Sequence, residues 1–141
     1  MAGNTDPIYS RVGDVSTNGT TGMSQAITAA AADFTGAGAN NVLVWTADAT
    51  NGGFLQKLRA KAVGTNAATS LRVFINNGSA NTTAANNTFY TDTNLPSTAG
   101  AVGLDIDIPM NIALNPGFRI YVGLSSAVAA GWVVTGVGGK Y

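Results

Sequence analysis

The chain has 141 residues, the length of a single domain, and only 10% of them are charged, compared with about 25% in an average globular protein. Seven Lys and Arg residues balance seven Asp residues, so the formal net charge is zero, and histidine, cysteine and glutamate are absent. Because most hydrolytic, redox and metal-dependent sites use those three residue types, we expect neither an enzyme nor a metal or cofactor protein. A neutral chain also has no general attraction for nucleic acids or acidic membranes.

The N-terminal residues have neither the basic nor the apolar region of a signal peptide, and no apolar run reaches the roughly 18 residues needed to cross a bilayer. The absence of cysteine fits folding in a reducing cytosol. These features predict a protein that is made in the cytoplasm and has no membrane partner.

Two parts are expected along the chain. Residues 1–20 are polar and rich in turn-forming residues, and they predict an extended N-terminal arm with one short strand near residues 8–12. Residues 21–141 predict a single β domain. The alanine run at residues 29–32 would suit a helix, but an isolated helix of this length is marginal, so we expect a strand or irregular structure there.

Two segments in the middle of the chain alternate apolar and polar side chains. Residues 54–63 and 70–76 show this pattern, and residues 64–67 turn the chain between them, which predicts a β-hairpin. The side chains expected to point inward are Leu58, Ala60, Ala62, Leu71, Val73 and Ile75. Those expected to point outward are Lys57, Arg59, Lys61, Arg72 and Phe74.

Loops and strands alternate in the rest of the chain. The Asn- and Thr-rich residues 77–87 contain too few apolar side chains to pack, and they predict an exposed loop. Further strands are expected at residues 42–46, 88–91, 102–109, 118–124 and 131–137, with Arg119 and Tyr121 outward. About seven to nine short strands separated by turns predict an all-β fold, an antiparallel β-sandwich of the jelly-roll type.

The outward side chains of these strands form the main candidate interface. Its members are cationic or aromatic: Lys57, Arg59, Lys61, Arg72, Phe74, Arg119 and Tyr121. Such a set can contact an acidic protein surface or a neighbouring subunit, because Arg and Tyr are enriched at interfaces, and it can equally be a solvated sheet face. Basic strands with aromatic residues also bind single-stranded nucleic acid, but the zero net charge argues against that partner.

Two smaller groups have both a functional and a structural interpretation. Asp105 and Asp107 point the same way on one strand and could share a hard cation or act as an acid–base pair, although a solvated or interface face is the simpler interpretation. Trp45 and Trp132 could form a sugar-stacking platform, but each has apolar strand neighbours, which favours a place in the core or at an interface.

Three stretches of the sequence resemble small structural proteins of tailed bacteriophages. They are residues 4–8 (NTDPI), the block 53–78 with GFLQKLRAKA and RVFINNG, and residues 114–122 (LNPGFRIYV) with the glycine-rich end 138–141. The chain looks most like a capsid decoration (cement) protein. This resemblance implies a jelly-roll subunit that forms a homotrimer on the capsid exterior, with an N-terminal arm that reaches neighbouring coat subunits. The residues that match the arm are Asp6, Pro7, Ile8, Tyr9 and Arg11.

The leading hypothesis is therefore a non-enzymatic virion protein that decorates and stabilises a tailed-phage capsid by binding the major capsid protein and its own copies. It would be made in the host cytoplasm and lie on the capsid exterior. The alternative is a receptor- or carbohydrate-binding module of a tail or head fibre, which would use the loop at residues 77–87 and an exposed aromatic side chain near Phe89 or Tyr90. A metal-assisted enzyme that uses Asp105 and Asp107 has the least support from the residue inventory.

Overall fold

The computed structural model describes residues 12–17, 26–100 and 104–141, which form eight β-strands and one short 3-10 helix. The strands are β1 (Val12–Thr17), β2 (Val42–Thr46), β3 (Gly53–Ala62), β4 (Thr69–Asn76), β5 (Asn87–Leu95), β6 (Asp105–Leu114), β7 (Arg119–Leu124) and β8 (Trp132–Lys140). The helix η1 (Ala84–Asn86) lies in the exposed loop between β4 and β5. The predicted all-β class is confirmed.

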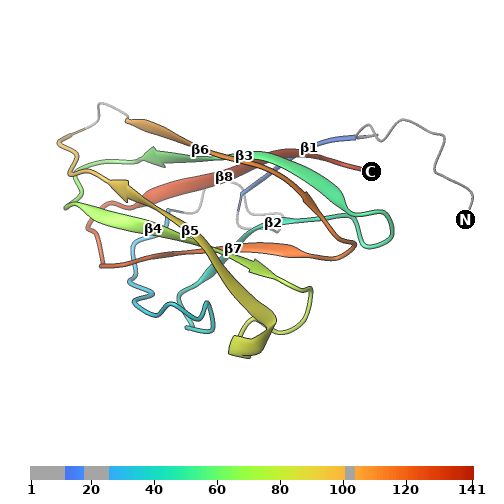
Figure 1. Cartoon of the computed structure of the whole chain (residues 1–141). Helices are drawn as coiled ribbons and strands as arrows, with labels where there is room; N and C mark the ends of the chain where they lie inside the picture. Colours follow the sequence, from blue (N-terminus) through green and yellow to red (C-terminus); the bar gives the residue numbers. More distant parts are fainter. Residues whose placement is uncertain (1–11, 18–25, 101–103) are drawn as a thin grey trace, which may run out of the picture.

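The strands form two antiparallel four-stranded sheets that lie face to face as a sandwich (Figure 1). Sheet A has the strand order β1-β8-β3-β6, and sheet B has the order β2-β7-β4-β5. Of the described strands, only β4 and β5 are neighbours both in the chain and in a sheet. Nearly all strand pairing therefore joins segments that are far apart in the sequence.

Inward side chains from both sheets pack into one hydrophobic core. The largest fully buried members include Leu58 of sheet A, Val73 of sheet B and both tryptophans, Trp45 and Trp132. Each large side chain that is fully buried contributes roughly 1.5–3 kcal/mol, so this core dominates the stability. Of the two places expected for the tryptophans, the core or an interface, the structure shows the core, and complete burial rules out their use as a sugar platform.

The predicted hairpin of residues 54–63 and 70–76 is wrong. Both segments are strands, but β3 pairs with β6 and β8 in sheet A, whereas β4 pairs with β5 and β7 in sheet B. Residues 63–68 instead carry the chain from one sheet to the other. The buried side chain of Asn66 holds this crossing, because its Oδ1 accepts the N–H groups of Ala130 and Gly131. Alternation indicates which face of a strand is buried but not which strand is its neighbour.

The edge strand β6 extends beyond the predicted residues 102–109 and runs through Pro109 to Leu114. Proline has no N–H group, and an edge strand tolerates this loss because one side of its backbone is unpaired. The register with β3 shifts between Leu55 and Lys57, and Asn111 has a positive φ of 49°. A proline and an irregular register both discourage pairing of this edge with another chain.

β1 lies within the predicted N-terminal arm and is the edge strand of sheet A, paired with β8 along its whole length. The remaining arm residues, which include Asp6, Pro7, Ile8, Tyr9 and Arg11, lie outside the described residues. The division of the chain into an arm at 1–20 and a domain at 21–141 therefore stays a prediction.

A segment of irregular structure, residues 31–41, lies across the outer face of sheet B. The N–H of Ala31 donates to the carbonyl oxygen of Leu124 at 2.7 Å, and a Cβ atom at Gly36 would lie 2.9 Å from the ring of Phe74. Phe74 points away from the core cluster but is fully buried beneath this segment. The expectation that Phe74 belongs to an open surface is therefore wrong. No helix in the described part of the chain is long and apolar enough to span a membrane.

We expect Gly138→Ala to lower the free energy of unfolding by roughly 1–3 kcal/mol. A Cβ atom at this position of β8 would lie 2.3 Å from the carbonyl oxygen of Phe54, so the two strands would have to separate. Gly13→Ala in β1 is the matched control, because a Cβ atom there meets nothing within 4 Å. Urea denaturation of the three proteins measures the effect. Equal midpoints for the two variants would contradict the close approach of β8 and β3.

Candidate functional site

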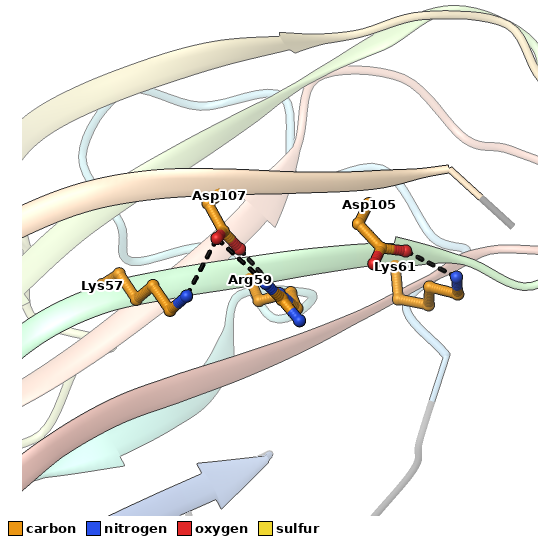
Figure 2. A network of polar contacts seen from close by, with 5 residues as sticks. All are labelled: Lys57, Arg59, Lys61, Asp105 and Asp107. Carbon is orange, nitrogen blue, oxygen red and sulfur yellow. Dashed lines mark hydrogen bonds and ion pairs between the residues drawn. The ribbon is translucent and has the colours of Figure 1, made fainter.

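The outer face of sheet A carries a network of five charged side chains, here named the ion-pair ladder: Lys57, Arg59 and Lys61 on β3 with Asp105 and Asp107 on β6 (Figure 2). The register places Arg59 directly opposite Asp107, and Lys61 directly opposite Asp105. Cross-strand neighbours on one face lie close enough for direct contact. The cations and carboxylates that the sequence presented as two separate groups are therefore partners.

Asp107 is the centre of the ladder. Its Oδ1 accepts a hydrogen bond of 2.7 Å from Nε of Arg59. Its Oδ2 accepts hydrogen bonds from Nη2 of Arg59 at 3.0 Å and from Nζ of Lys57 at 2.9 Å. Lys57 stands opposite Pro109 rather than opposite a carboxylate, so its side chain reaches diagonally to Asp107, as Figure 2 shows. Lys61 and Asp105 form a separate contact of 2.5 Å.

The ladder stabilises the ionised form of the Asp107 carboxyl group. Hydrogen bonds from Arg59 and then from Lys57 keep the pKa of the Asp107 carboxyl well below its usual range, and the bond to Asp107 raises the pKa of Arg59. The side chains are 30–46% exposed, so water screens these interactions and their contribution to stability is small. The network orders the side chains of this face, and its three cations and two carboxylates leave one net positive charge.

The remaining members of the candidate interface lie on the opposite side of the molecule. Arg72, Phe74, Arg119 and Tyr121 belong to β4 and β7 of sheet B, so the single basic surface expected from the sequence is divided between two faces. Phe74 and Tyr121 stand opposite each other and are both buried, and Arg72 and Arg119 are partly buried. The expected surface is therefore split into the three cations of β3 on sheet A and a separate group on sheet B.

Arg72 is committed to contacts within the chain. Its Nη1 donates to the carbonyl oxygen of Asp33 at 3.1 Å, and its guanidinium lies 3.9 Å from the centre of the Phe34 ring. Phe34 in turn meets Phe89 of β5 edge to face, with ring centres 5.5 Å apart. The arginine thus fastens residues 31–41 to sheet B instead of offering a free charge to a partner.

The turn that presents Phe34 was not recognised from the sequence. Oδ1 of Asp33 accepts the N–H groups of Thr35 and Gly36 at 2.9 and 2.8 Å, which is the hydrogen-bond pattern of an Asx turn. Gly36 has a φ of 71°, a conformation that favours glycine. The order Asp33, Thr35, Gly36 is a local signal for such a turn, although it does not show where the aromatic side chain beside it will lie.

A shallow hollow adjoins the ladder and is lined by Gln56, Lys57, Asp107, Pro109 and Asn111. It lies where the register of β3 and β6 shifts. Its two charged residues are bound to each other, so the hollow has a polar rim without a strong field of either sign. The described residues contain no group of three or more acidic side chains placed to hold a metal ion.

Comparison of the chain with protein-family models, with curated proteins and with solved structures gives no match.

We predict that Asp107→Asn lowers the melting temperature at neutral pH and has progressively less effect below about pH 4. The pKa of Asp107 is lower in the folded chain than in the unfolded chain, so its stabilising contribution is present above the unfolded pKa. That contribution is lost as the pH falls through the folded pKa. The effect should be small and should shrink in high salt, because the carboxylate is partly exposed.

Thermal denaturation across a series of pH values measures this difference. Asp92→Asn is the control, since Asp92 is an exposed aspartate on β5 outside the ladder. A melting difference for Asp107→Asn that stays constant between neutral and acid pH would show that the ladder does not bind the ionised carboxylate.

Proposed function

We propose that this chain is a non-enzymatic structural protein of a tailed-phage virion, which decorates the capsid exterior as a homotrimer and binds the major capsid protein. The observation that carries the proposal is the strand order. Eight strands in the order 1-8-3-6 facing 2-7-4-5 support a jelly roll, an architecture found in viral capsid and lectin domains. Because a fold can host many functions, the proposal also draws on the surface and on the sequence resemblance.

The sequence resemblance supplies the phage assignment. Two of its segments include strands: residues 53–78 contain β3 and β4, and residues 114–122 run into β7. These strands pair with others in both sheets, so the resembling residues belong to the framework of the fold. The third segment, residues 4–8, lies outside the described residues and within the proposed arm.

The outer face of sheet A is the face that we assign to subunit or coat contact. Val15 of β1 is 57% exposed there and stands beside Val137 of β8, which is itself opposite Lys57 of the ladder. Each cation of this face already contacts a carboxylate, with Lys57 and Arg59 sharing Asp107, so the ladder keeps one net positive charge. Burying an unpaired charge is costly in an interface, and these preformed pairs reduce that cost.

The position of β1 supports the proposed arm. Its first residue, Val12, stands opposite Lys140 of β8, and Lys140 also forms a 3.6 Å ion pair with Asp14. The described part of the chain therefore begins, at Val12, on an edge strand of sheet A.

Decoration of this kind depends on multiple weak contacts. A single subunit of this size offers a modest contact area, but three linked subunits make the second and third contacts intramolecular, which raises the overall affinity by orders of magnitude. The low proportion of charged residues is suited to such contacts, because charged side chains are depleted in the core of interfaces.

The purified chain is expected to be a homotrimer. Light scattering should give about 43 kDa, three times the 14.2 kDa of one chain. Val15→Asp adds a charge to the outer face of sheet A and should shift the mass toward the monomer. Thr82→Asp, at an exposed position in the loop between β4 and β5 of sheet B, should leave the mass unchanged. A wild-type monomer at micromolar concentration would refute the trimer.

The chain is also expected on the outside of phage particles. Particles induced from the strain that encodes it should carry the chain in the purified virion fraction, and electron microscopy with a specific antibody should place it on the head surface. Density on a fibre would move the assignment to the tail or head fibre alternative, and absence from purified particles would refute a virion role.

A further inference from the structure

Three partly exposed aromatic side chains lie along one edge of sheet B: Phe34 at 60%, Phe89 at 39% and Tyr90 at 43% exposure. They are here named the aromatic platform. Phe34 comes from the segment that covers the sheet, and Phe89 and Tyr90 come from the edge strand β5. Exposed apolar residues that occur singly are normal on protein surfaces, whereas apolar residues that are exposed together are candidates for a contact with a ligand or partner.

An irregularity in β5 produces this grouping. Val73 stands opposite Thr91, but the next residue of β4, Phe74, stands opposite Phe89, so Tyr90 is an additional residue in the register. Phe89 stands opposite Phe74 and therefore faces outward with it. Thr91 stands opposite the core residue Val73 and faces inward, so its neighbour Tyr90 faces outward. The bulge therefore places two consecutive aromatic residues on the outer face. Bulges commonly redirect a side chain at a functional position.

The platform is held in place from below and from the side. Phe89 rests on the buried ring of Phe74, with ring centres 5.6 Å apart, and packs edge to face against Phe34. The guanidinium of Arg72 lies 3.9 Å from the centre of the Phe34 ring. Phe34 and Phe89 are fixed in this way, so they lose little conformational freedom when a ligand contacts their exposed surface, which lowers the cost of binding.

The neighbouring loop at residues 77–87 is also fixed before any ligand arrives. The side-chain amide of Asn86 donates to the carbonyl oxygen of Ala80 at 2.9 Å, and that of Asn87 donates to the carbonyl oxygen of Asn81 at 2.7 Å. Asn87 lies against the segment that carries Phe34, since a Cβ atom at Gly36 would lie 3.2 Å from the Cβ of Asn87. The loop that precedes Phe89 in the chain is thus polar and preformed.

The charges around the platform indicate which ligands suit it. Two carboxylates lie near the platform: Asp92 is on β5, and Asp33 is in the turn that precedes Phe34. Arg72 stands opposite Asp92 in the sheet, but its guanidinium already donates to main-chain carbonyl oxygens. This arrangement disfavours phosphate and sulfate groups. A specific protein partner would need a buried area above about 1,000 Å², much more than three rings within a polar border provide.

We propose that the aromatic platform binds a neutral oligosaccharide. The C–H face of a sugar ring stacks on an aromatic face, whose quadrupole is negative, and sugar hydroxyls donate hydrogen bonds to exposed carboxylates such as Asp92. This proposal concerns sheet B and does not depend on the contact assigned to sheet A. A decoration protein with such a site would add glycan binding to its structural role.

The test uses the full chain and four neutral oligosaccharides: maltohexaose, cellohexaose, mannohexaose and chitohexaose. Isothermal titration should detect binding of at least one of them, and the same titration with a heparin hexasaccharide should not. Phe34→Leu keeps an apolar side chain without a flat face and should weaken the affinity by about tenfold or more, whereas Phe34→Tyr keeps the ring and should bind like the wild type. Val63→Leu, at an exposed position away from the platform, is the control for surface changes.

Three results would overturn the proposal. They are silence with all four neutral oligosaccharides, equal affinity in the wild type and Phe34→Leu, and stronger binding of the heparin hexasaccharide. A change in oligomeric mass in Phe34→Leu, with no loss of sugar binding, would instead assign the platform to a protein contact. Unchanged melting temperatures in the variants exclude misfolding, and the mass of the wild-type oligomer tests the decoration role separately.

Discussion

The packing of two sheets against each other is the constraint on which every other feature of this protein depends. Each strand gives alternate side chains to the shared core, where residues such as Leu58, Val73 and Trp45 are fully buried. Only the remaining half of each strand is available for binding or chemistry. The sandwich therefore has two outer faces, and the side chains and segments that cover each face decide what the protein can bind.

The two outer faces differ in their side chains and in their covering. Sheet A keeps an open outer face, on which the ion-pair ladder concentrates five of the fourteen charged residues of the chain. Sheet B is covered by residues 31–41, which bury Phe74 and leave Phe34 at the surface beside Phe89. One face thus carries three cations paired with two carboxylates, and the other carries a small aromatic site at its edge.

This division allows two kinds of contact without competition. A contact at sheet A would occupy one side of the subunit, and a ligand at the aromatic platform would occupy the other. A subunit attached to a shell through sheet A would therefore keep its sheet B edge accessible. The geometry makes the structural and the ligand-binding hypotheses compatible, although each rests on its own observations.

The sequence alone determined the β class, the presence and facing of most strands, the exposed loop at residues 77–87 and the burial of Trp45 and Trp132, because alternation and turn residues are local properties. The pairing of β3 with β6, which joins Arg59 to Asp107, was decided by the tertiary structure, since alternation carries no information about a strand's neighbour. The same holds for the separation of Lys57 from Arg72 onto opposite sheets. It also holds for the covering of Phe74 and for the meeting of Phe34 with Phe89, because each requires segments distant in the chain to pack together.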